Sequence, residues 1–532
     1  MKTQICKYLS EIVSDVSAEE LEGLIEIPPE EKLGDYALPC FGLAKKMRKN
    51  PAMIAEDMVK ALDMRKEALG IDRVENVGAY CNIFLNRVQY INKCVDSLMS
   101  KNLGVTQIGT GKTVCMDYSS PNIAKNFHVG HLRTTIIGNS LYKIHEKLGY
   151  KVVRINHLGD WGTQFGKLIV AYKLWSSKEQ VEADGIDELL RIYIKFNNEA
   201  EHNPKLIEEA REWFVKMEHD DYEAIHIWKW FKEISMVEFD RVYKLLDMSF
   251  DVYMGESFYR VLVPKLVQEL EKRDLLVESQ GAKVIVLADY NMPPCLITKS
   301  DGGSIYHSRD IAAVLYRKKN YHFDKCLYVT GLEQTLHFKQ VFKAIEMMGY
   351  DWADELIHIP YGLVNLDGEK LSTRSGNIIY AEDILKEAIE RANVAIKEKN
   401  PELKDRESVA EMIGVGAIIF HDLFNQRIKN VEFSWKDVLS FEGATGPYVQ
   451  YTYARAKSIL RKSKEDVSKY EPSVVARYII SLATAFNKFY HECPILQADV
   501  DTKMARLYVV NLVQLVIKDA CSLLGMKCPE EM

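Results

Sequence analysis

The side chains best suited to chemistry lie in a segment that holds two histidines around one glycine. His128-Val129-Gly130-His131 follows an apolar run at 113–116, which predicts a buried strand, and precedes residues 132–148, whose apolar spacing predicts a helix. The N–H groups and dipole of a helix N-terminus favour phosphate. The two imidazoles can donate to phosphoryl oxygens that gain charge during transfer, and Gly130 lets a base or phosphate approach the backbone. The segment predicts a nucleotide site.

A second segment, far downstream, is polar, cationic and rich in small residues. Residues 368–377 include Lys370 and show no helical or strand periodicity. A solvated surface turn is the simpler interpretation of this segment by itself. The four residues 128–131 can also arise by chance at the start of an ordinary helix, so neither segment alone defines a function.

Together, and in this order, the two segments resemble the HIGH and KMSKS signatures of class I aminoacyl-tRNA synthetases. The residues around them narrow the resemblance to the arginyl-tRNA synthetase family, from about residue 27 to the C-terminus. The resemblance implies an α/β fold: a Rossmann-like doubly wound parallel-sheet catalytic domain with a helical insertion, a small α/β N-terminal domain and an all-α C-terminal anticodon-binding bundle. His128, Gly130, His131 and Lys370 match the signatures, which implies that all four bind ATP and that the histidines and the lysine are catalytic.

The second signature departs from the general pattern at one cation. Thr373 stands where the pattern has its second lysine, and Ser375 stands where many relatives have lysine, whereas Arg374 follows the arginyl pattern. Many arginyl-tRNA synthetases share the first change and carry a lysine just before the HIGH signature as its substitute. Lys125 occupies that position, so the resemblance implies that it binds ATP and takes part in catalysis; its simpler interpretation is a surface lysine.

The amino-acid pocket should offer acidic groups, because a guanidinium is a planar fork of five donors that suits carboxylates. Tyr306 and Asp310 lie four residues apart and share a face if a helix begins there. The resemblance implies arginine contacts for Asp117, Tyr306 and Asp310 at the guanidinium, for Asn122 and Gln334 at the α-amino end, and for His128 near the carboxylate. Taken singly, each has a simpler alternative as a cap, an ion-pair partner or an exposed loop amide.

A third segment, residues 157–166, also matches the family. His157 and Asp160 are candidates for ATP contacts, while Gly159 and Gly162 permit a tight loop. A purely structural turn is the alternative.

The tRNA-binding candidates come from an aromatic and basic run near the C-terminus. Aromatic faces can stack unpaired bases while cations contact phosphates. The predicted contacts are Tyr448, Tyr453, Arg455, Lys457 and Arg461. Tyr448 and Tyr451 share one helical face, so about half of the run is expected to pack in a core instead.

Three domains are expected along the chain. Residues 1–105 form an α/β domain, with a helix over 41–62 and a strand over 77–85, and the resemblance implies that it contacts the tRNA elbow. Residues 110–390 form the catalytic domain, with strands near 114–116, 152–156, 326–329 and 356–361 and an insertion at about 166–280 that is too short for an editing domain. Residues 400–532 are expected to be helical throughout.

The composition is that of a globular protein. The 532 residues are 47% hydrophobic and 27% charged, with a formal net charge of −7, which allows a local basic face for RNA but not a basic surface overall. The ten cysteines form no C-x-x-C pair, so we expect reduced thiols and no zinc. No signal peptide or membrane span is predicted, and a cytoplasmic location is expected. The family implies a monomer.

The resemblance implies an arginine–tRNA ligase. With ATP and Mg²⁺ the enzyme would convert L-arginine to arginyl-adenylate and transfer the arginyl group to the 2′-OH of the terminal adenosine of tRNA(Arg), with bound tRNA needed for activation. A class I synthetase for glutamate or cysteine is one alternative, although paired aspartates would repel glutamate and zinc-type cysteines are missing. A catalytically inactive tRNA-binding paralogue is the other.

Overall fold

The computed structural model describes residues 2–13, 16–99, 107–300, 303–366, 369–370, 380–399, 401–403, 405–440, 443–456, 473–493, 495 and 500–529. Contacts divide the chain into two compact units, Met1–Leu103 and Gly104–Met532. Each unit is described by itself.

The first unit is a small antiparallel sheet covered by helices. Its strands, in the spatial order β1-β3-β2, are β1 Tyr36–Pro39, β3 Tyr80–Leu85 and β2 Ile71–Val77. The helices are α1 Lys2–Ile12, α2 Ala18–Leu24, α3 Ala44–Met47, α4 Pro51–Met64, α5 Lys66–Leu69 and α6 Arg87–Met99. Apolar side chains of α1 and α4 pack with those of β3 in one core.

Two predicted elements of this unit are interrupted. The helix expected over 41–62 breaks after α3, where Arg48 has a left-handed φ of 48° and Asn50 caps α4 ahead of Pro51. The strand expected over 77–85 begins only at Tyr80, because the chain turns between β2 and β3 at Gly78, whose φ is +61°. In both cases turn chemistry overrides the apolar pattern.

The second unit contains a five-stranded parallel sheet. Its spatial order is β11-β10-β4-β5-β6. The strands are β4 Thr113–Asp117, β5 Lys151–Asn156, β6 Val252–Tyr253, β10 Lys325–Gly331 and β11 Leu356–Tyr361. The four predicted strands are therefore confirmed, with β4 central between β10 and β5. Chain order reverses at β4, which is where open α/β sheets place their ligands.

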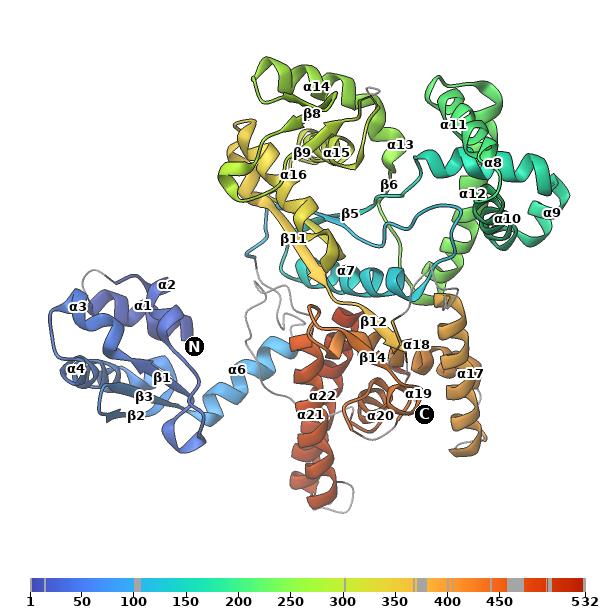
Figure 1. The fold of residues 1–532 in the computed structure, drawn as a ribbon. Helices are drawn as coiled ribbons and strands as arrows, with labels where there is room; N and C mark the ends of the chain where they lie inside the picture. The colour runs from blue at the N-terminus through green and yellow to red at the C-terminus, as the bar shows by residue number, and fades with distance from the viewer. Residues whose placement is uncertain are drawn as a thin grey trace. The chain divides into compact units, whose positions relative to one another are not determined.

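Helices cover both faces of this sheet (Figure 1). α7 Val129–Lys147 lies on one face, while α14 Val263–Lys272, α15 Tyr306–Tyr321 and α16 Thr335–Met347 lie on the other and pack with the sheet in one apolar core. A small antiparallel sheet joins this second layer; its strands are β7 Val277–Ser279, β8 Ala282–Ile285 and β9 Cys295–Thr298. The doubly wound fold is confirmed.

A helical insertion separates β5 from β6. Its helices are α8 Thr163–Trp175, α9 Lys178–Asp184, α10 Ile186–Ala200, α11 Lys205–Glu218 and α12 Tyr222–Leu246. They gather into a cluster beside the sheet (Figure 1). The short α13 Glu256–Tyr259 follows β6 and leads into the second half of the sheet.

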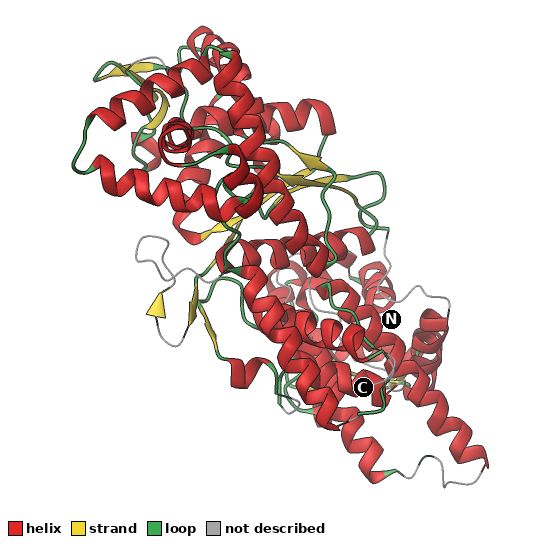
Figure 2. Ribbon diagram, turned by 90° about the vertical axis from the view of Figure 1, so that its right-hand side faces the viewer, coloured by secondary structure: helices red, strands yellow, loops and turns green. Residues whose placement is uncertain are grey.

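The C-terminal part is predominantly helical, as Figure 2 shows. Its helices are α17 Ala381–Lys399, α18 Arg406–Phe424, α19 Trp435–Val438, α20 Gly446–Ala456, α21 Ser473–Glu492 and α22 Val500–Leu524. The expectation of helices throughout residues 400–532 is wrong at one point, because β14 Val431–Phe433 pairs in parallel with β12 Val364–Leu366. That pairing places the start of the C-terminal part beside the strand that leads into the second signature.

Candidate active site

The N-terminus of α7 is built from the two signature histidines. His128 is the N-cap residue, and its Nδ1 accepts from the backbone N–H of Gly130 at 3.1 Å. The Nδ1 of His131 accepts from the backbone N–H of His128 at 3.4 Å, and the two rings stack with centroids 3.9 Å apart. A backbone N–H can only donate, so in the neutral rings both protons sit on Nε2. Each ring thus keeps one N–H free to donate to a ligand.

Both histidines are held neutral. Burial, with a contribution from the Lys125 charge, lowers the pKa of His128 to about 4. Burial also lowers the pKa of His131 well below its ordinary value, and His128 and Lys125 add to the effect. Lys125 is exposed beside them. The site therefore presents one cation and two neutral N–H donors, a combination suited to phosphate oxygens.

The backbone leading to this helix is strained. Ser119, Ser120 and Ala124 have φ values of 70°, 44° and 59°, in the left-handed region that residues with a Cβ rarely adopt. Such strain concentrates at functional sites, where surrounding contacts hold it. At Gly130, a Cβ would lie 2.9 Å from the His128 ring, so the glycine is needed for the ring to fold over the helix end as well as for ligand approach.

The second signature is tied to the first at both of its ends. On one side, β13 Glu369–Lys370 pairs with β12, with Lys370 opposite Asn365. On the other, Tyr380 forms a bridge with His128, and the N–H of Ala381 donates to the carbonyl of Phe127 at 2.8 Å. The chain therefore returns to the first signature directly after the loop. The side chain of Lys370, and Thr373, Arg374 and Ser375 entirely, lie outside the described residues.

Arg133 joins the signature helix to this region. Its buried guanidinium donates to the carbonyls of Leu363 at 3.2 Å and of Arg427 and Lys429 at 3.0 Å each, and its Nε lies 3.3 Å from Oδ1 of Asp422 in α18. Arg133 was not among the residues predicted from the sequence. Its position one turn into α7, beyond the last histidine, is the signal that was available.

We predict that Arg133→Met lowers the free energy of unfolding by about 3 kcal/mol, because breaking a buried pair from one side leaves an uncompensated charge. The change in the urea midpoint would measure this. The double variant Arg133→Met/Asp422→Leu removes both charges and should recover part of the loss; the three carbonyls that accept from Arg133 lose their donor in both variants. A double variant as unstable as the single one would contradict the assignment.

The predicted arginine pocket lies at the carboxyl ends of the parallel strands. Asp117 is the last residue of β4, and His157 follows the end of β5. Tyr306 is the first residue of α15 and Asp310 lies one turn later, so the predicted helical pairing is confirmed. The Nδ1 of His157 lies 3.8 Å from Oδ2 of Asp117, and its Nε2 lies 4.0 Å from Oδ1 of Asp310. The imidazole therefore stands between two carboxylates.

The two aspartates have different partners. Oδ2 of Asp117 forms an ion pair at 2.7 Å with Nη2 of Arg317, and Oδ1 accepts from Oγ of Ser120 at 2.8 Å. Oδ2 of Asp310 contacts Nε2 of His337 at 2.6 Å. Burial acts to raise the pKa of Asp310, but the His337 hydrogen bond and the nearby positive charges outweigh it, so the pKa lies below its ordinary value. Asp310 is therefore ionised at neutral pH.

Glu256 is an acid of this region that sequence reasoning missed. It is the first residue of α13, and Nη2 of Arg309 lies 3.1 Å from its Oε2. Burial raises the pKa of Glu256 to about 8, with contributions from the Asp310 and Asp160 charges. A buried acid with a raised pKa that also feels the Asp310 charge is a functional-site candidate. The available signal was an acid separated by two residues from the end of a strand of the parallel sheet.

The two predicted amide contacts are exposed. Asn122 lies in the signature loop and bridges to Gly159, where a Cβ would come within 2.0 Å of Asn122 Oδ1. Gln334 ends a short 3-10 turn directly after β10. Both amides are thus free to turn toward a ligand, but their roles stay predictions.

Asp160 has a structural environment. Its carboxylate is fully buried and accepts from the backbone N–H and the Oγ of Ser257, both at 2.8 Å, and from Nζ of Lys232 at 2.7 Å. The Asp160 carbonyl accepts from Nε1 of Trp228 at 2.7 Å. This environment favours the structural-turn alternative over the predicted ATP contact for Asp160.

Two side chains of the insertion support the signature loop, and neither was selected from the sequence. Oγ of Ser235 accepts from the N–H of Ala124 at 2.8 Å, and Oε1 of Glu238 accepts from the N–H of Phe127 at 3.1 Å. Burial raises the pKa of Glu238 to about 7. Their positions fit the ordinary periodicity of a helix, so nothing in the local sequence distinguishes these two residues as contacts of the signature loop.

One predicted tRNA contact is wrong. Tyr453 is 2% exposed, and its hydroxyl accepts from Nε2 of Gln514 at 2.9 Å, so its ring packs inside the helical bundle and cannot stack a base. Tyr448 is half-buried and accepts from Nδ2 of Asn487 at 3.0 Å. Arg455 lies on α20, but its side chain is outside the described residues, as are Lys457 and Arg461 entirely.

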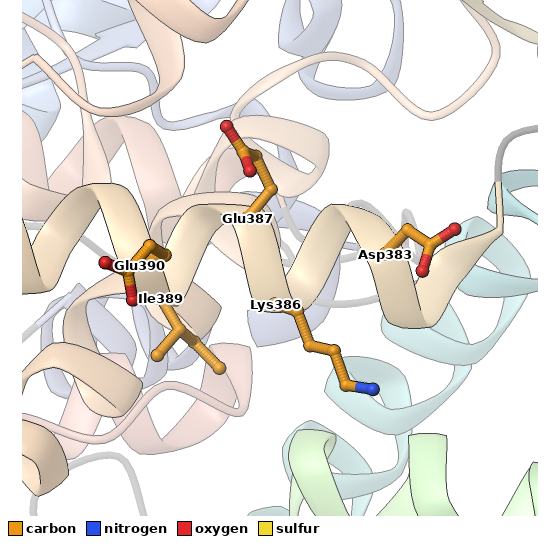
Figure 3. A pocket seen from close by; sticks show the side chains of 5 residues that line it. All are labelled: Asp383, Lys386, Glu387, Ile389 and Glu390. Carbon is orange, nitrogen blue, oxygen red and sulfur yellow. The ribbon is translucent and has the colours of Figure 1, made fainter.

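Other features of the surface add little to the site. The hollow in Figure 3 is lined by Asp383, Lys386, Glu387, Ile389 and Glu390, which all come from α17 and include none of the signature residues. Within the described ranges, no cluster of three or more His, Cys, Asp or Glu side chains suits a metal ion. Across the same ranges, every helix is too short or too polar to cross a membrane.

The fold and the paired signatures define a class I aminoacyl-tRNA synthetase. The family described as "tRNA synthetases class I (R), catalytic domain" matches residues 93–435, the "Arginyl tRNA synthetase N terminal domain" matches residues 1–85, and the "DALR anticodon binding domain" matches residues 467–532. The chain belongs to the arginyl-tRNA synthetase family.

Individual relatives agree over their full lengths. The chain is 47% identical to the arginine–tRNA ligase of Alkaliphilus metalliredigens, covering 100% of this chain and 99% of that protein, and 46% identical to that of Clostridioides difficile with the same coverage. The arginyl-tRNA synthetase structure from Thermus thermophilus superposes with a TM-score of 0.84 at 24% identity, covering 100% of this chain and 99% of that one. At that identity the superposition shows the shared fold.

Proposed function

We propose that this chain is an arginine–tRNA ligase that activates L-arginine with MgATP and transfers it to the 2′-OH of the terminal adenosine of tRNA(Arg). The observation that carries the proposal is the acidic cluster at the carboxyl ends of the parallel strands, in a chain of this family. Asp310 is ionised and partly exposed at the strand ends, where a cationic side chain would enter. Neither glutamate nor an uncharged amino acid would suit such a pocket.

The first step is attack of the arginine carboxylate on the α-phosphorus of ATP, with pyrophosphate leaving. No protein nucleophile is required, so catalysis is positioning and stabilisation of charge. His128 and His131 donate their Nε2 protons to phosphate oxygens, and Lys125 and Lys370 supply positive charge to the leaving pyrophosphate. Mg²⁺ enters with ATP as part of the substrate.

The pocket recognises arginine by shape and charge. Asp310 and Tyr306 take the guanidinium, while Asn122 and Gln334 hold the α-amino end and His128 faces the carboxylate. His157 lines the same pocket. Lysine is a poor mimic because its single ammonium cannot form a bidentate pair with a carboxylate. Hydrogen-bonding pockets can reject analogues that lack their donors by about 10⁴-fold, so no editing domain is needed.

The remaining parts serve tRNA. Residues 1–105 would contact the tRNA elbow, residues 110–390 would hold the active site, and residues 400–532 would bind the anticodon with Tyr448, Arg455, Lys457 and Arg461 among the contacts. Bound tRNA would be required for activation. A cytoplasmic monomer is the assembly we propose.

The decisive experiment is aminoacylation of total tRNA with each proteinogenic amino acid, ATP and Mg²⁺. Charging with arginine alone would support the reaction and the pocket together. Charging with another amino acid would leave the fold in place but reject the pocket residues. tRNA binding without any charging would support the inactive paralogue instead.

A further inference from the structure

Arg317 is a charged residue in the pocket wall that no step of the proposed reaction uses. It lies on α15, and its side chain is 0% exposed. Its guanidinium lies 5.8 Å from the ring centroid of Tyr259 and 5.4 Å from that of Tyr328, so aromatic faces surround it. A buried cation in such surroundings cannot reach a substrate, and what it contacts determines what it does.

The guanidinium of Arg317 contacts two pocket residues at once. Its Nη2 lies 2.7 Å from Oδ2 of Asp117 and 2.9 Å from Nδ1 of His157. Arginine has donors and no acceptor, so Nδ1 of His157 must be the acceptor. In the neutral ring the proton then resides on Nε2, the nitrogen that faces Asp310 across 4.0 Å.

The pairing also changes the charge that Asp117 can offer. Asp117 is 6% exposed, with one carboxylate oxygen bound to Arg317 and the other to Ser120. The negative charge of Asp117 is thus neutralised inside the protein before any substrate arrives. Asp310 is more accessible, with a side chain that is 25% exposed, and its ion-pair contacts are with the imidazoles of His337 and His157.

We propose that Arg317 is a positioning residue that retains Asp117 as its internal counterion and holds His157 as a neutral Nε2–H donor, so that the substrate guanidinium is recognised through Asp310 and not through Asp117. The inference rests on the proposed function only in naming arginine as the substrate. It reassigns Asp117, for which family resemblance implies direct contact with the guanidinium.

The charges around His157 determine what happens when Arg317 is removed. Four charged residues surround His157: Asp117 at the end of β4, Arg317 and Asp310 on α15, and Asp160 in the loop that follows β5. The Tyr259 ring of α13 stacks on the imidazole, with ring centroids 5.3 Å apart. Burial lowers the pKa of His157 and Arg317 lowers it further, whereas Asp117 and Asp310 act to raise it. Without Arg317, both aspartates would pull a proton onto His157.

In Arg317→Met, a protonated His157 would compete with the substrate guanidinium for Asp310. The ratio of the variant KM for arginine to the wild-type KM should rise as the pH falls from about 8 to about 6, by up to about tenfold per pH unit for one competing protonation. The ratio of kcat values should change much less. A purely structural loss would affect both constants at every pH, so a KM ratio that is independent of pH would overturn the proposal.

Two further variants complete the test. Arg317→Met/Asp117→Asn removes the acid nearest His157 and should flatten the pH dependence; a dependence as steep as in the single variant would contradict the pairing. Lys319→Met, an exposed change on the same helix, should leave KM unchanged.

The tautomer can be measured without any variant of Arg317. In enzyme labelled with ¹⁵N-histidine, with the signal assigned through His157→Gln, the Nδ1 shift should be that of an unprotonated nitrogen near neutral pH. A protonated Nδ1 would overturn the inference. Because this measurement needs no substrate, it separates failure of the Arg317 assignment from failure of the arginine–tRNA ligase proposal, which the amino-acid panel tests.

Discussion

Replacing Asp310 with Asn is expected to lower kcat/KM for arginine by about 10²- to 10³-fold, because truncating one partner of a buried charge pair costs roughly 2–5 kcal/mol. Asparagine keeps the shape of the side chain and can still accept from His337, which now holds Oδ2 at 2.6 Å. The loss therefore isolates the charge offered to the guanidinium. Steady-state charging at varied arginine concentration measures kcat/KM, and the loss should appear mainly as an increase in KM.

The affinity for tRNA should stay unchanged in Asp310→Asn, because the residue lies at the strand ends of the catalytic sheet and not on the C-terminal helices. Asp354→Asn, an exposed carboxylate in the same unit, is the matched control and should charge arginine normally. Normal arginine KM in Asp310→Asn would show that the guanidinium binds elsewhere and would reject the pocket.

Replacing His128 with Ala is expected to lower kcat by about 10²- to 10³-fold, the usual cost of removing one preorganised donor from a developing negative charge. The N-cap contact to Gly130 would be lost as well. His128→Gln retains an N–H donor at a similar distance and should recover part of the rate. Arginine-dependent ATP–pyrophosphate exchange in the presence of tRNA measures the activation step directly, and His202→Ala, an exposed histidine of the insertion, is the control.

The pH dependence tests the same residue in another way. Burial lowers the pKa of His128 to about 4, so the ring is neutral at higher pH and becomes protonated only as the pH falls through that value. The wild-type rate of pyrophosphate exchange should therefore show no ionisation of His128 above about pH 6. An inflection near neutral pH that disappears in His128→Gln would contradict the neutral-donor role.

These residues also explain why the signature segments can work together. Leu363 and Ala381, on either side of the second signature, are bound to Arg133 and Phe127 of the first. Residues more than two hundred positions apart in sequence thus share hydrogen bonds at one helix end. The residues that flank the second signature are therefore held next to the first signature.

The sequence by itself determined the local chemistry. A strand, a His-x-Gly-His segment and a helix are adjacent in the chain, and helical periodicity alone places Tyr306 and Asp310 on one face, so both could be predicted. The breaks at Asn50-Pro51 and Gly78 were also local signals, although the apolar pattern obscured them. The doubly wound sheet was expected from the resemblance to the family, and the apolar runs along the chain located four of its strands.

Only the tertiary structure decided which polar groups are free and which are already paired. Asp117 and Asp310 are the same residue type in the sequence. In the structure, Arg317 neutralises Asp117 from two hundred positions away, while Asp310 faces the pocket beside His337. Tyr453 was indistinguishable from a base-stacking tyrosine until the bundle buried it against Gln514. Pairing and burial depend on long-range packing, and no local pattern contains that information.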